Sequence, residues 1–184
     1  MRPVGYLLNT REGLAGEPGI YYDYIIAGNG VFVRSRNRCL EATVNVTWAD
    51  VRGLLPLYES LSLPGGRVPR QLYNLALSLF SADPWNEHYV AVTWNGCYHL
   101  KMPIQEKSPG KVRYERLPDT MMDIHSHGLG SAWFSGTDNR DEQEMKVYMV
   151  VGEVDKLFLE VDFRVGVYGY FAPVELSEVF NVQS

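Results

Sequence analysis

Two histidines and an aspartate in one short segment have the clearest capacity for chemistry in this sequence. Residues 121–124 are mostly apolar and predict a strand that leaves the core with His125 and His127 at its end. Side chains at positions i and i+2 of a strand share a face, so both imidazoles can reach one ion at the roughly 2.0–2.1 Å of a zinc–nitrogen bond. The spacing of the histidines therefore predicts part of a metal site.

A third ligand is expected at Asp138, which follows a glycine-containing loop at residues 128–134 and starts an acidic run typical of a helix's first turn. The loop is long enough to return Asp138 to the histidines. Three protein ligands and an open fourth position are typical of a catalytic zinc site. Ser135 and Asp138 also match a helix capping box, so the tetrad by itself leaves open whether Ser135 is only an N-cap.

Other metalloproteins share parts of this pattern. The string Asp123-x-His125-x-His127 also opens amidohydrolase barrels, but these need about 250 residues and further histidines, and no histidine follows His127. A cupin would need a glutamate, and a metallo-β-lactamase an aspartate, shortly after the second histidine, and residues 128–130 supply neither. The absence of His-Glu-x-x-His and Cys-x-x-Cys motifs excludes the zincin and zinc-deaminase patterns.

The His-x-His motif, the loop and the Ser-x-x-Asp motif together resemble the signature of the JAMM (MPN+/JAB1) metalloproteases. The resemblance covers residues 67–184 and implies an α/β (α+β) fold, with a cytidine-deaminase-like mixed sheet flanked by helices. It implies a zinc ion (Zn²⁺) bound by His125, His127 and Asp138, and a deubiquitinase-like peptidase or isopeptidase activity. It also implies that Ser135 helps to hold the carbonyl oxygen of the substrate during hydrolysis.

A general base is expected at Glu87. Hydrolysis at such a site needs a carboxylate that takes a proton from water and passes one to the leaving amine. The JAMM fold has a helix, a proline-containing turn and then a glutamate that opens a strand, and this sequence has the same order around Pro84 and Glu87. Three other glutamates are weaker candidates because none follows a helix in this way: Glu41, Glu106 and Glu115.

Asp123 is a further candidate, because it lies two residues before His125 and shares its face of the strand. It could orient a metal ligand by accepting a hydrogen bond, and a buried carboxylate at a turn is the alternative. His88 and His99 have no partners by spacing and are predicted to be structural.

Within the JAMM family, the strings at residues 68–70, 123–128, 134–138 and 150–152 look most like the bacterial JAMM proteins of PRTRC systems. These are encoded beside ParB-related and ThiF-related (E1-like) proteins on plasmids and mobile elements. The resemblance implies a ubiquitin-like or sulfur-carrier-like protein tail as substrate and an E1-like neighbour as a candidate partner. Gly128 stands where many family members have proline, which predicts a less rigid loop.

The composition bounds the remaining classes of function. A chain of 184 residues with 46% hydrophobic and 21% charged residues is typical of one globular domain, alone or with a small companion. A net charge of −5 and a pI near 5.4 disfavour nucleic acid as a partner. No apolar run predicts a membrane span or a signal peptide, and Cys39 and Cys97 have no metal-type spacing. We therefore expect a cytoplasmic protein that binds neither nucleic acid nor membrane.

The order of elements predicts a small β-rich N-terminal unit at residues 1–66 and the JAMM-like domain at residues 67–184, separated at a Pro-Gly-Gly turn. Residues 1–19 are predicted to be irregular. An amphipathic helix should follow Pro69, with apolar residues at 72, 75, 76, 79 and 80. The other strands are expected at 21–27, 31–34, 40–48, 87–94, 97–100, 111–117, 145–151, 157–163 and 165–171.

Two classes of function fit the sequence. The first is a zinc-dependent metallohydrolase of the JAMM type. The alternative is a non-catalytic MPN-like scaffold or interaction module in a plasmid or mobile-element maintenance complex. A DNA-repair-associated JAB domain is disfavoured by the acidic balance. Tight binding of a partner that survives loss of His125 and His127, without cleavage of that partner, would favour the scaffold.

Overall fold

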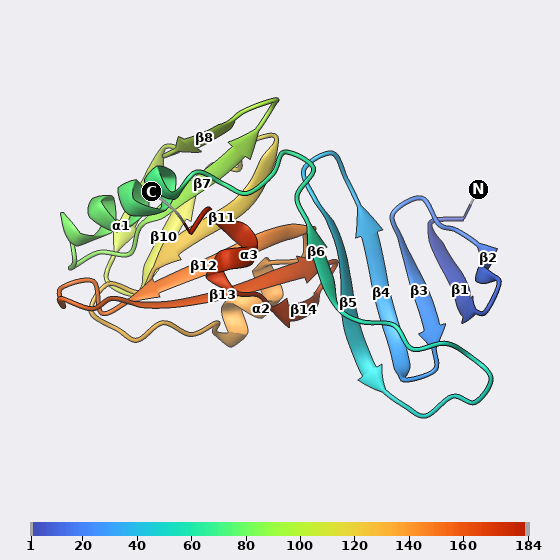
Figure 1. Ribbon diagram of the computed structural model, residues 1–184. Helices are drawn as coiled ribbons and strands as arrows, with labels where there is room; N and C mark the ends of the chain where they lie inside the picture. Colours follow the sequence, from blue (N-terminus) through green and yellow to red (C-terminus); the bar gives the residue numbers. More distant parts are fainter. Residues whose placement is uncertain (1, 183–184) are drawn as a thin grey trace.

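The N-terminal third of the chain forms one six-stranded sheet, which stands at one end of the molecule (Figure 1). The computed structural model describes residues 2–182. In chain order the strands are β1 (Val4–Thr10), β2 (Gly13–Glu17), β3 (Tyr22–Ala27), β4 (Gly30–Arg36), β5 (Glu41–Trp48) and β6 (Ser60–Ser62). They lie in the order β2-β1-β3-β4-β5-β6, with β1 parallel to β3 and the other neighbours antiparallel.

The predicted strands of this region are confirmed, with one correction. The hairpin β3–β4 and the strand β5 lie where the sequence predicts them. The prediction that residues 1–19 are irregular is wrong, because β1 and β2 lie there. β1 pairs with β3, which comes later in the chain, and β2 is exposed along its whole length and contains two glycines. β2 therefore lacks the alternating pattern by which strands are recognised, and β1 alternates between less and more exposed residues only over residues 4–8.

A second six-stranded sheet carries the candidate site. Its strands are β7 (Tyr89–Trp94), β8 (Tyr98–Lys101), β11 (Thr120–Ser126), β12 (Lys146–Gly152), β13 (Glu160–Val167) and β14 (Tyr170–Pro173). They lie in the order β14-β13-β12-β11-β7-β8. β11 and β12 run parallel, and the other neighbours run antiparallel. A two-stranded ribbon, β9 (Gln105–Ser108) and β10 (Lys111–Tyr114), lies between β8 and β11 in the chain.

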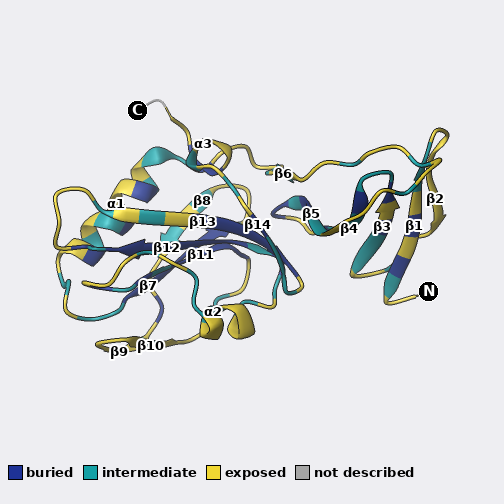
Figure 2. Cartoon of the chain, turned by 90° about the horizontal axis from the view of Figure 1, so that it is seen from below, coloured by how far each residue is buried: buried dark blue, intermediate teal, exposed yellow. Residues whose placement is uncertain are grey.

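The two faces of the second sheet are covered by different elements. The helices of the described residues are α1 (Arg70–Ser81), α2 (Gly136–Asp141) and α3 (Leu176–Val179). Figure 2 shows α1 and α3 on one side of the sheet, and the β9–β10 ribbon and α2 on the other. None of the helices within residues 2–182 is long and apolar enough to cross a membrane.

The amphipathic helix predicted after Pro69 is confirmed as α1. Its buried residues are Tyr73, Ala76 and Phe80, which recur at the spacing of one helix face. Leu75, which was predicted to lie on the apolar face, is 49% exposed. Tyr73, which the prediction did not include, belongs to the buried face instead.

Two predicted boundaries in the second sheet are wrong. The strand expected at residues 87–94 begins at Tyr89, so Glu87 lies in the loop before it. The closing hairpin turns at Tyr168 and Gly169 instead of at residue 164. Both turn residues have positive φ, 50° and 88°, as a two-residue hairpin turn of the primed type requires. Arg164 is consequently an interior residue of β13.

The two sheets share a hydrophobic core. Val33, Ala42 and Val44 of the first sheet belong to the same cluster of buried residues as Met122 and Val147 of the second. These observations confirm the coarse prediction of a mixed α and β fold. The first sheet ends at Ser62, and the domain boundary at residue 66 stays a prediction.

Candidate metal centre

The strand β11 positions the histidines. It lies inside the second sheet between β7 and β12, and its first five residues are fully or nearly buried. Met122 and Ile124 face the hydrophobic core, whereas Asp123 and His125 line a cavity on the opposite face. His127 follows directly after the strand, and its backbone N–H donates to the carbonyl of Val151 over 2.8 Å. The predicted strand is therefore present with His125 on it, and His127, just beyond its end, lines the same cavity.

The short helix α2 positions Asp138. Ser135 is the N-cap, and its hydroxyl oxygen accepts hydrogen bonds from the backbone N–H groups of Thr137 and Asp138, each over 3.2 Å. In return, the Ser135 N–H donates to Asp138 Oδ2 over 2.6 Å. The capping box that the sequence left open is therefore formed. It uses one carboxylate oxygen of Asp138 and leaves Oδ1 to face His125.

The loop between the histidines and α2 has a fixed path. Gly128 has φ of 57°, and a Cβ at this residue would lie 2.8 Å from the carbonyl oxygen of Pro84. Proline, with φ near −65°, could not adopt this conformation. The carbonyls of Gly128 and Gly130 accept hydrogen bonds from the N–H groups of Val154 and Glu153. The backbone of the loop is thus tied to Glu153 and Val154 at two residues, and the expectation of a less rigid loop at Gly128 stays a prediction.

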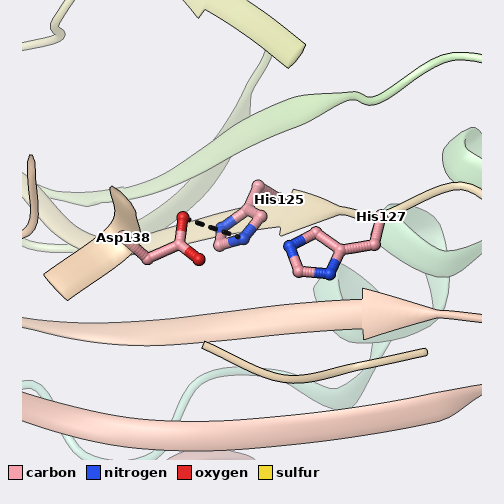
Figure 3. A group of neighbouring side chains, drawn as sticks. All are labelled: His125, His127 and Asp138. Carbon is pink, nitrogen blue, oxygen red and sulfur yellow. Dashed lines mark ion pairs between the residues drawn. The ribbon is translucent and has the colours of Figure 1, made fainter. Parts of the chain in front are cut away.

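The three predicted metal ligands converge on one point (Figure 3). His125, His127 and Asp138 each offer a ligand atom, and these atoms all lie within 4.8 Å of one another. His125 Nε2 and Asp138 Oδ1 are 3.7 Å apart. Ligand atoms of a tetrahedral zinc site with bonds of about 2.0–2.2 Å lie roughly 3.3–3.6 Å apart, so the observed separation is close to that of a zinc site.

The hydrogen bonds of these side chains test whether a metal fits. His125 Nε2 is buried and has no hydrogen-bond partner among residues 2–182. His127 Nδ1 lies 3.1 Å from the carbonyl oxygen of Ser131, which favours the tautomer that leaves the lone pair of Nε2 free. Asp138 keeps one oxygen free of the capping box. Each residue therefore has one donor atom available for a metal, and two nitrogens with one carboxylate oxygen suit zinc.

The protonation states also suit a metal. Burial lowers the pKa of His125 to about 4 against the opposing effect of Asp138, with smaller contributions in the same direction from the charges of His127 and Arg164. Burial by itself raises the pKa of Asp138, but His125 and the hydrogen bonds from Ser135 outweigh it and hold this pKa below its usual value. At neutral pH the site therefore presents a neutral imidazole and an ionised carboxylate, the forms that bind metal.

Glu87 lines the same cavity as the three candidate ligands, although it lies in a loop and not at the start of a strand. It is half-buried, and burial raises the pKa of its carboxyl group, with the charge of Asp138 adding to the effect and His127 opposing it. The structure thus brings the predicted base to the predicted ligands. The other glutamates considered, at 41, 106 and 115, do not line this cavity.

The loop that carries Glu87 is fixed by its neighbours. The carboxylate of Asp83 accepts hydrogen bonds from Asn86 and lies 3.1 Å from Nε2 of the buried His88 and 3.7 Å from Nζ of Lys107. The Glu87 N–H donates to the carbonyl of Ser108 on the ribbon over 3.2 Å. His88 thus has a partner that the spacing did not reveal, and its structural role stays a prediction.

Asp123 lines the cavity deeper along β11. It is almost fully buried, and its carboxylate accepts hydrogen bonds from the hydroxyl of Tyr89 over 2.5 Å and from Nζ of Lys146 over 3.1 Å. Burial raises the pKa of Asp123, and Lys146 opposes the shift. Among the described residues its contacts therefore run to Tyr89 and Lys146 and not to a histidine. The predicted role in orienting a metal ligand has no direct contact to support it.

Two hollows meet at the candidate site. The larger has a volume of about 560 Å³ and extends from the three ligands to the ribbon and to Arg116, Glu144 and Lys146. The smaller, of about 290 Å³, shares Glu87 and His127 with the larger one, and Trp85, Pro109 and Leu129 form part of its wall. Because Glu87 and His127 line both hollows, an extended chain could occupy both of them at once.

The residues that surround α2 were not predicted from the sequence. Arg164 on β13 contacts Glu142 and Asn139, which lie just after Asp138. A signal for Arg164 was present, because it is a charged residue inside the otherwise apolar second half of β13, and buried charges need partners. The identity of those partners could not be read from the spacing.

The chain was compared with known proteins. No model of a known protein family matches it, and no curated protein matches it. The likeness to the JAMM signature therefore rests on the residues of the chain itself.

Proposed function

We propose that this chain is a zinc-dependent hydrolase of the JAMM type, which cleaves a peptide or isopeptide bond at the tail of a ubiquitin-like or sulfur-carrier-like protein. The observation that carries the proposal is the buried Nε2 atom of His125, which has no hydrogen-bond partner among the described residues and lies beside His127 and Asp138. An unsatisfied buried polar group costs about 1–3 kcal/mol. A metal ion bound by all three residues would remove this cost.

His125, His127 and Asp138 would hold the ion. Zinc with three protein ligands and an open fourth position supplies a Lewis acid that activates water at neutral pH. The coordination by two neutral imidazoles and one carboxylate leaves the ion with a net positive charge, which the site needs to polarise a carbonyl group. The hydrogen bond between His127 Nδ1 and Ser131 would fix the orientation of that ring.

Glu87 would transfer the protons. Its half-buried carboxylate lines the same cavity as the ligands, and burial raises its pKa toward the range that suits a general base at neutral pH. It would take a proton from the attacking water and give one to the leaving amine. The hydrogen bonds around Asp83 and the Glu87 N–H would keep the carboxylate in reach of both.

Ser135 would donate to the carbonyl oxygen of the substrate. Its oxygen accepts from two backbone N–H groups as the N-cap of α2, which leaves its own hydroxyl hydrogen available. The capping role and the catalytic role are therefore compatible in one side chain. Ser135 also lines the cavity with the ligands, as a donor to a reacting carbonyl must.

The substrate class is supported by the shape of the site and by the resemblance. The two hollows that share Glu87 and His127 suit an extended protein tail better than a compact small molecule. JAMM proteins of PRTRC systems, which the chain resembles, are encoded beside a ThiF-related (E1-like) protein. Such a neighbour supports a ubiquitin-like or sulfur-carrier-like substrate and makes the E1-like protein a candidate partner in the cytoplasm.

The first test of the proposal is zinc content. We expect about one zinc per chain by elemental analysis of protein purified without chelator, and almost none in the His125→Ala/His127→Ala double variant. Glu87→Gln should keep the zinc but lose cleavage of a ubiquitin-like or sulfur-carrier protein extended by a C-terminal peptide, followed by mass spectrometry. A parent chain that takes up no zinc, even when zinc is offered back, would favour the non-catalytic scaffold. Full cleavage by Glu87→Gln would show that another residue is the base.

A further inference from the structure

We propose that Arg164 is a positioning residue that holds Asp138 in its ligand position by fixing the helix α2 to the second sheet. The inference rests on the proposed metal site and identifies what determines its affinity. Arg164 lies on β13, two strands away from the histidines, and is 7% exposed. It reaches neither a candidate ligand nor the base by a hydrogen bond, so its contribution would pass through α2.

The helix α2 has little to hold it in place. It is six residues long, and none of these six described residues is buried. Isolated helices shorter than about 12–15 residues are marginal in water. The capping box between Ser135 and Asp138 fixes the first turn, but it is a local interaction within the helix. The place of α2 relative to β11 must therefore come from contacts outside the helix.

Arg164 supplies these contacts through hydrogen bonds. Its Nε and Nη2 donate to Glu142 Oε2 over 3.0 and 2.5 Å, and its Nη1 donates to Asn139 Oδ1 over 2.5 Å. Asn139 follows Asp138 directly, and the N–H of Glu142 donates to the carbonyl of Asp138 over 2.8 Å. Arg164 therefore fixes the residues on the C-terminal side of Asp138.

The same guanidinium fixes the approach to the helix. It lies between two aromatic rings, with its central carbon 3.9 Å from the centroid of Phe134 and 3.8 Å from that of Phe171. Phe134 directly precedes the N-cap Ser135, and Phe171 lies on β14. The arginine thus joins the loop before α2, the end of α2 and the edge of the sheet. Asp138 lies between the two points of attachment.

Only arginine suits this arrangement. The planar guanidinium can stack on both rings and donate to two acceptors in its own plane, whereas lysine has a single compact ammonium group. A buried ion pair is weak evidence for stability, because well-packed apolar residues often serve as well. The contacts of Arg164 are therefore better explained by the position they impose on α2 than by the stability of the core.

The charge of Arg164 and its position have opposite effects on metal affinity. A positive charge near the site disfavours a second cation, and Arg164 already contributes to the lowered pKa of His125. Removing this charge would tighten zinc binding if electrostatics alone mattered. Removing the contacts of Arg164 with Glu142 and Asn139 would weaken zinc binding, because Asp138 would no longer be held beside the histidines. The sign of the change in affinity therefore separates the two effects.

The test measures the zinc affinity of the full chain by competition with a chromophoric chelator. We expect Arg164→Met to weaken zinc binding by roughly 10–100-fold, the usual cost of losing a residue that orients a ligand. Arg164→Lys, which keeps the charge, should also bind zinc more weakly than the parent. Glu142→Gln keeps the shape of the side chain that Arg164 contacts and removes its charge, and we expect a several-fold loss of zinc affinity. The visible spectrum of the Co²⁺-substituted proteins should change with the loss of the carboxylate ligand.

A double-mutant cycle with Asp138→Ala supplies the decisive control. If Arg164 acts through Asp138, Arg164→Met should have almost no further effect on zinc affinity in the Asp138→Ala background. Arg34→Met, which removes a partly buried arginine from its ion pair with Asp23 in the first sheet, should leave zinc affinity unchanged. Circular dichroism and the melting temperature of the zinc-free proteins show whether each variant is folded.

Three results would overturn the inference. A folded Arg164→Met variant that binds zinc as tightly as the parent, or more tightly, would show that Arg164 does not position Asp138. An equal loss of affinity with and without Asp138 would show that Arg164 acts elsewhere in the protein. A parent chain that binds no zinc would overturn the proposed function and this inference with it, whereas the first two results overturn the inference alone.

Discussion

The strand β11 and the helix α2 supply ligands to the same candidate site, but they are held in different ways. β11 is hydrogen-bonded to β7 and β12 and is packed through Met122 and Ile124 into the core. The six residues of α2, all of them described, include none that is buried. The two histidines are thus fixed by the fold itself, whereas Asp138 is fixed by a capping box and by one arginine. Substitutions in β11 should therefore lower the stability of the fold, whereas substitutions around α2 should lower the metal affinity of the site.

The difference also bears on how the site could vary without loss of the fold. A carboxylate ligand on a weakly held helix can be moved or lost with little effect on the core. The histidines cannot move without disturbing β11, whose register with two neighbours is set by buried residues. A chain of this type could therefore lose its metal through changes in α2 and keep its structure, which is how a non-catalytic relative would be expected to arise.

The largest effect is expected from a cavity in β11. Ile124→Ala removes a fully buried side chain from the core and should lower the free energy of unfolding by about 2–5 kcal/mol, measured by urea denaturation of the zinc-free protein. Asp138→Asn keeps an acceptor for the capping box and should change the free energy of unfolding by roughly 0.5 kcal/mol or less. If Asp138→Asn lowered the free energy of unfolding as much as Ile124→Ala, the proposed difference between β11 and α2 would be wrong.

The next effect separates the two roles of Ser135. Ser135→Ala removes both the cap and the hydroxyl donor and should lower the rate of cleavage by roughly 10²–10³-fold. Ser135→Asp keeps a good N-cap but has no hydroxyl hydrogen at neutral pH, so it should be about as slow while α2 stays in place. Ser135→Thr keeps both groups and should be the most active of the three. An active Ser135→Asp variant would show that Ser135 serves only as the cap.

The smallest effect, expressed per unit of pH, is the loss of stability of the zinc-free protein as the pH falls. The pKa of His125 is about 4 in the folded chain, which is below the usual value of about 6.5 of an unfolded chain. Between these values the unfolded state binds more protons, so the stability contributed by neutral His125 is present above pH 6.5 and is lost as the pH falls toward 4. The slope should be at most roughly 1.4 kcal/mol per pH unit.

The stability contributed by Asp138 on α2 should be lost at lower pH than that contributed by His125. The pKa of Asp138 lies below its usual value, so its contribution is lost only as the pH falls from about 4 through the folded pKa. Urea denaturation between pH 7 and 3 would measure how stability changes over both pH ranges. The control is His125→Gln, which should remove most of the change between pH 6.5 and 4. A slope between pH 6.5 and 4 that persists in His125→Gln would contradict the assignment to this histidine.

Part of the structure followed from local patterns. The amphipathic helix after Pro69, the hairpin of β3 and β4 and the strand that carries the histidines were all predicted, because periodicity and turn residues are local signals. The strands β1 and β2 were not, since β1 alternates only over residues 4–8 and β2 has no buried side to mark it. An exposed strand such as β2 is determined by hydrogen bonding to a neighbour, which the sequence does not display.

The sequence by itself determined which side chains could bind a metal, because residue type and spacing fix what a strand and a capped helix can present. It also determined the capping box, which needs only Ser135 and Asp138. The tertiary structure alone decided that Asp138 returns to the histidines, that Glu87 reaches the same cavity from a loop, and that Arg164 joins α2 to the sheet. These contacts depend on packing between elements far apart in the chain, and no local pattern encodes such distances.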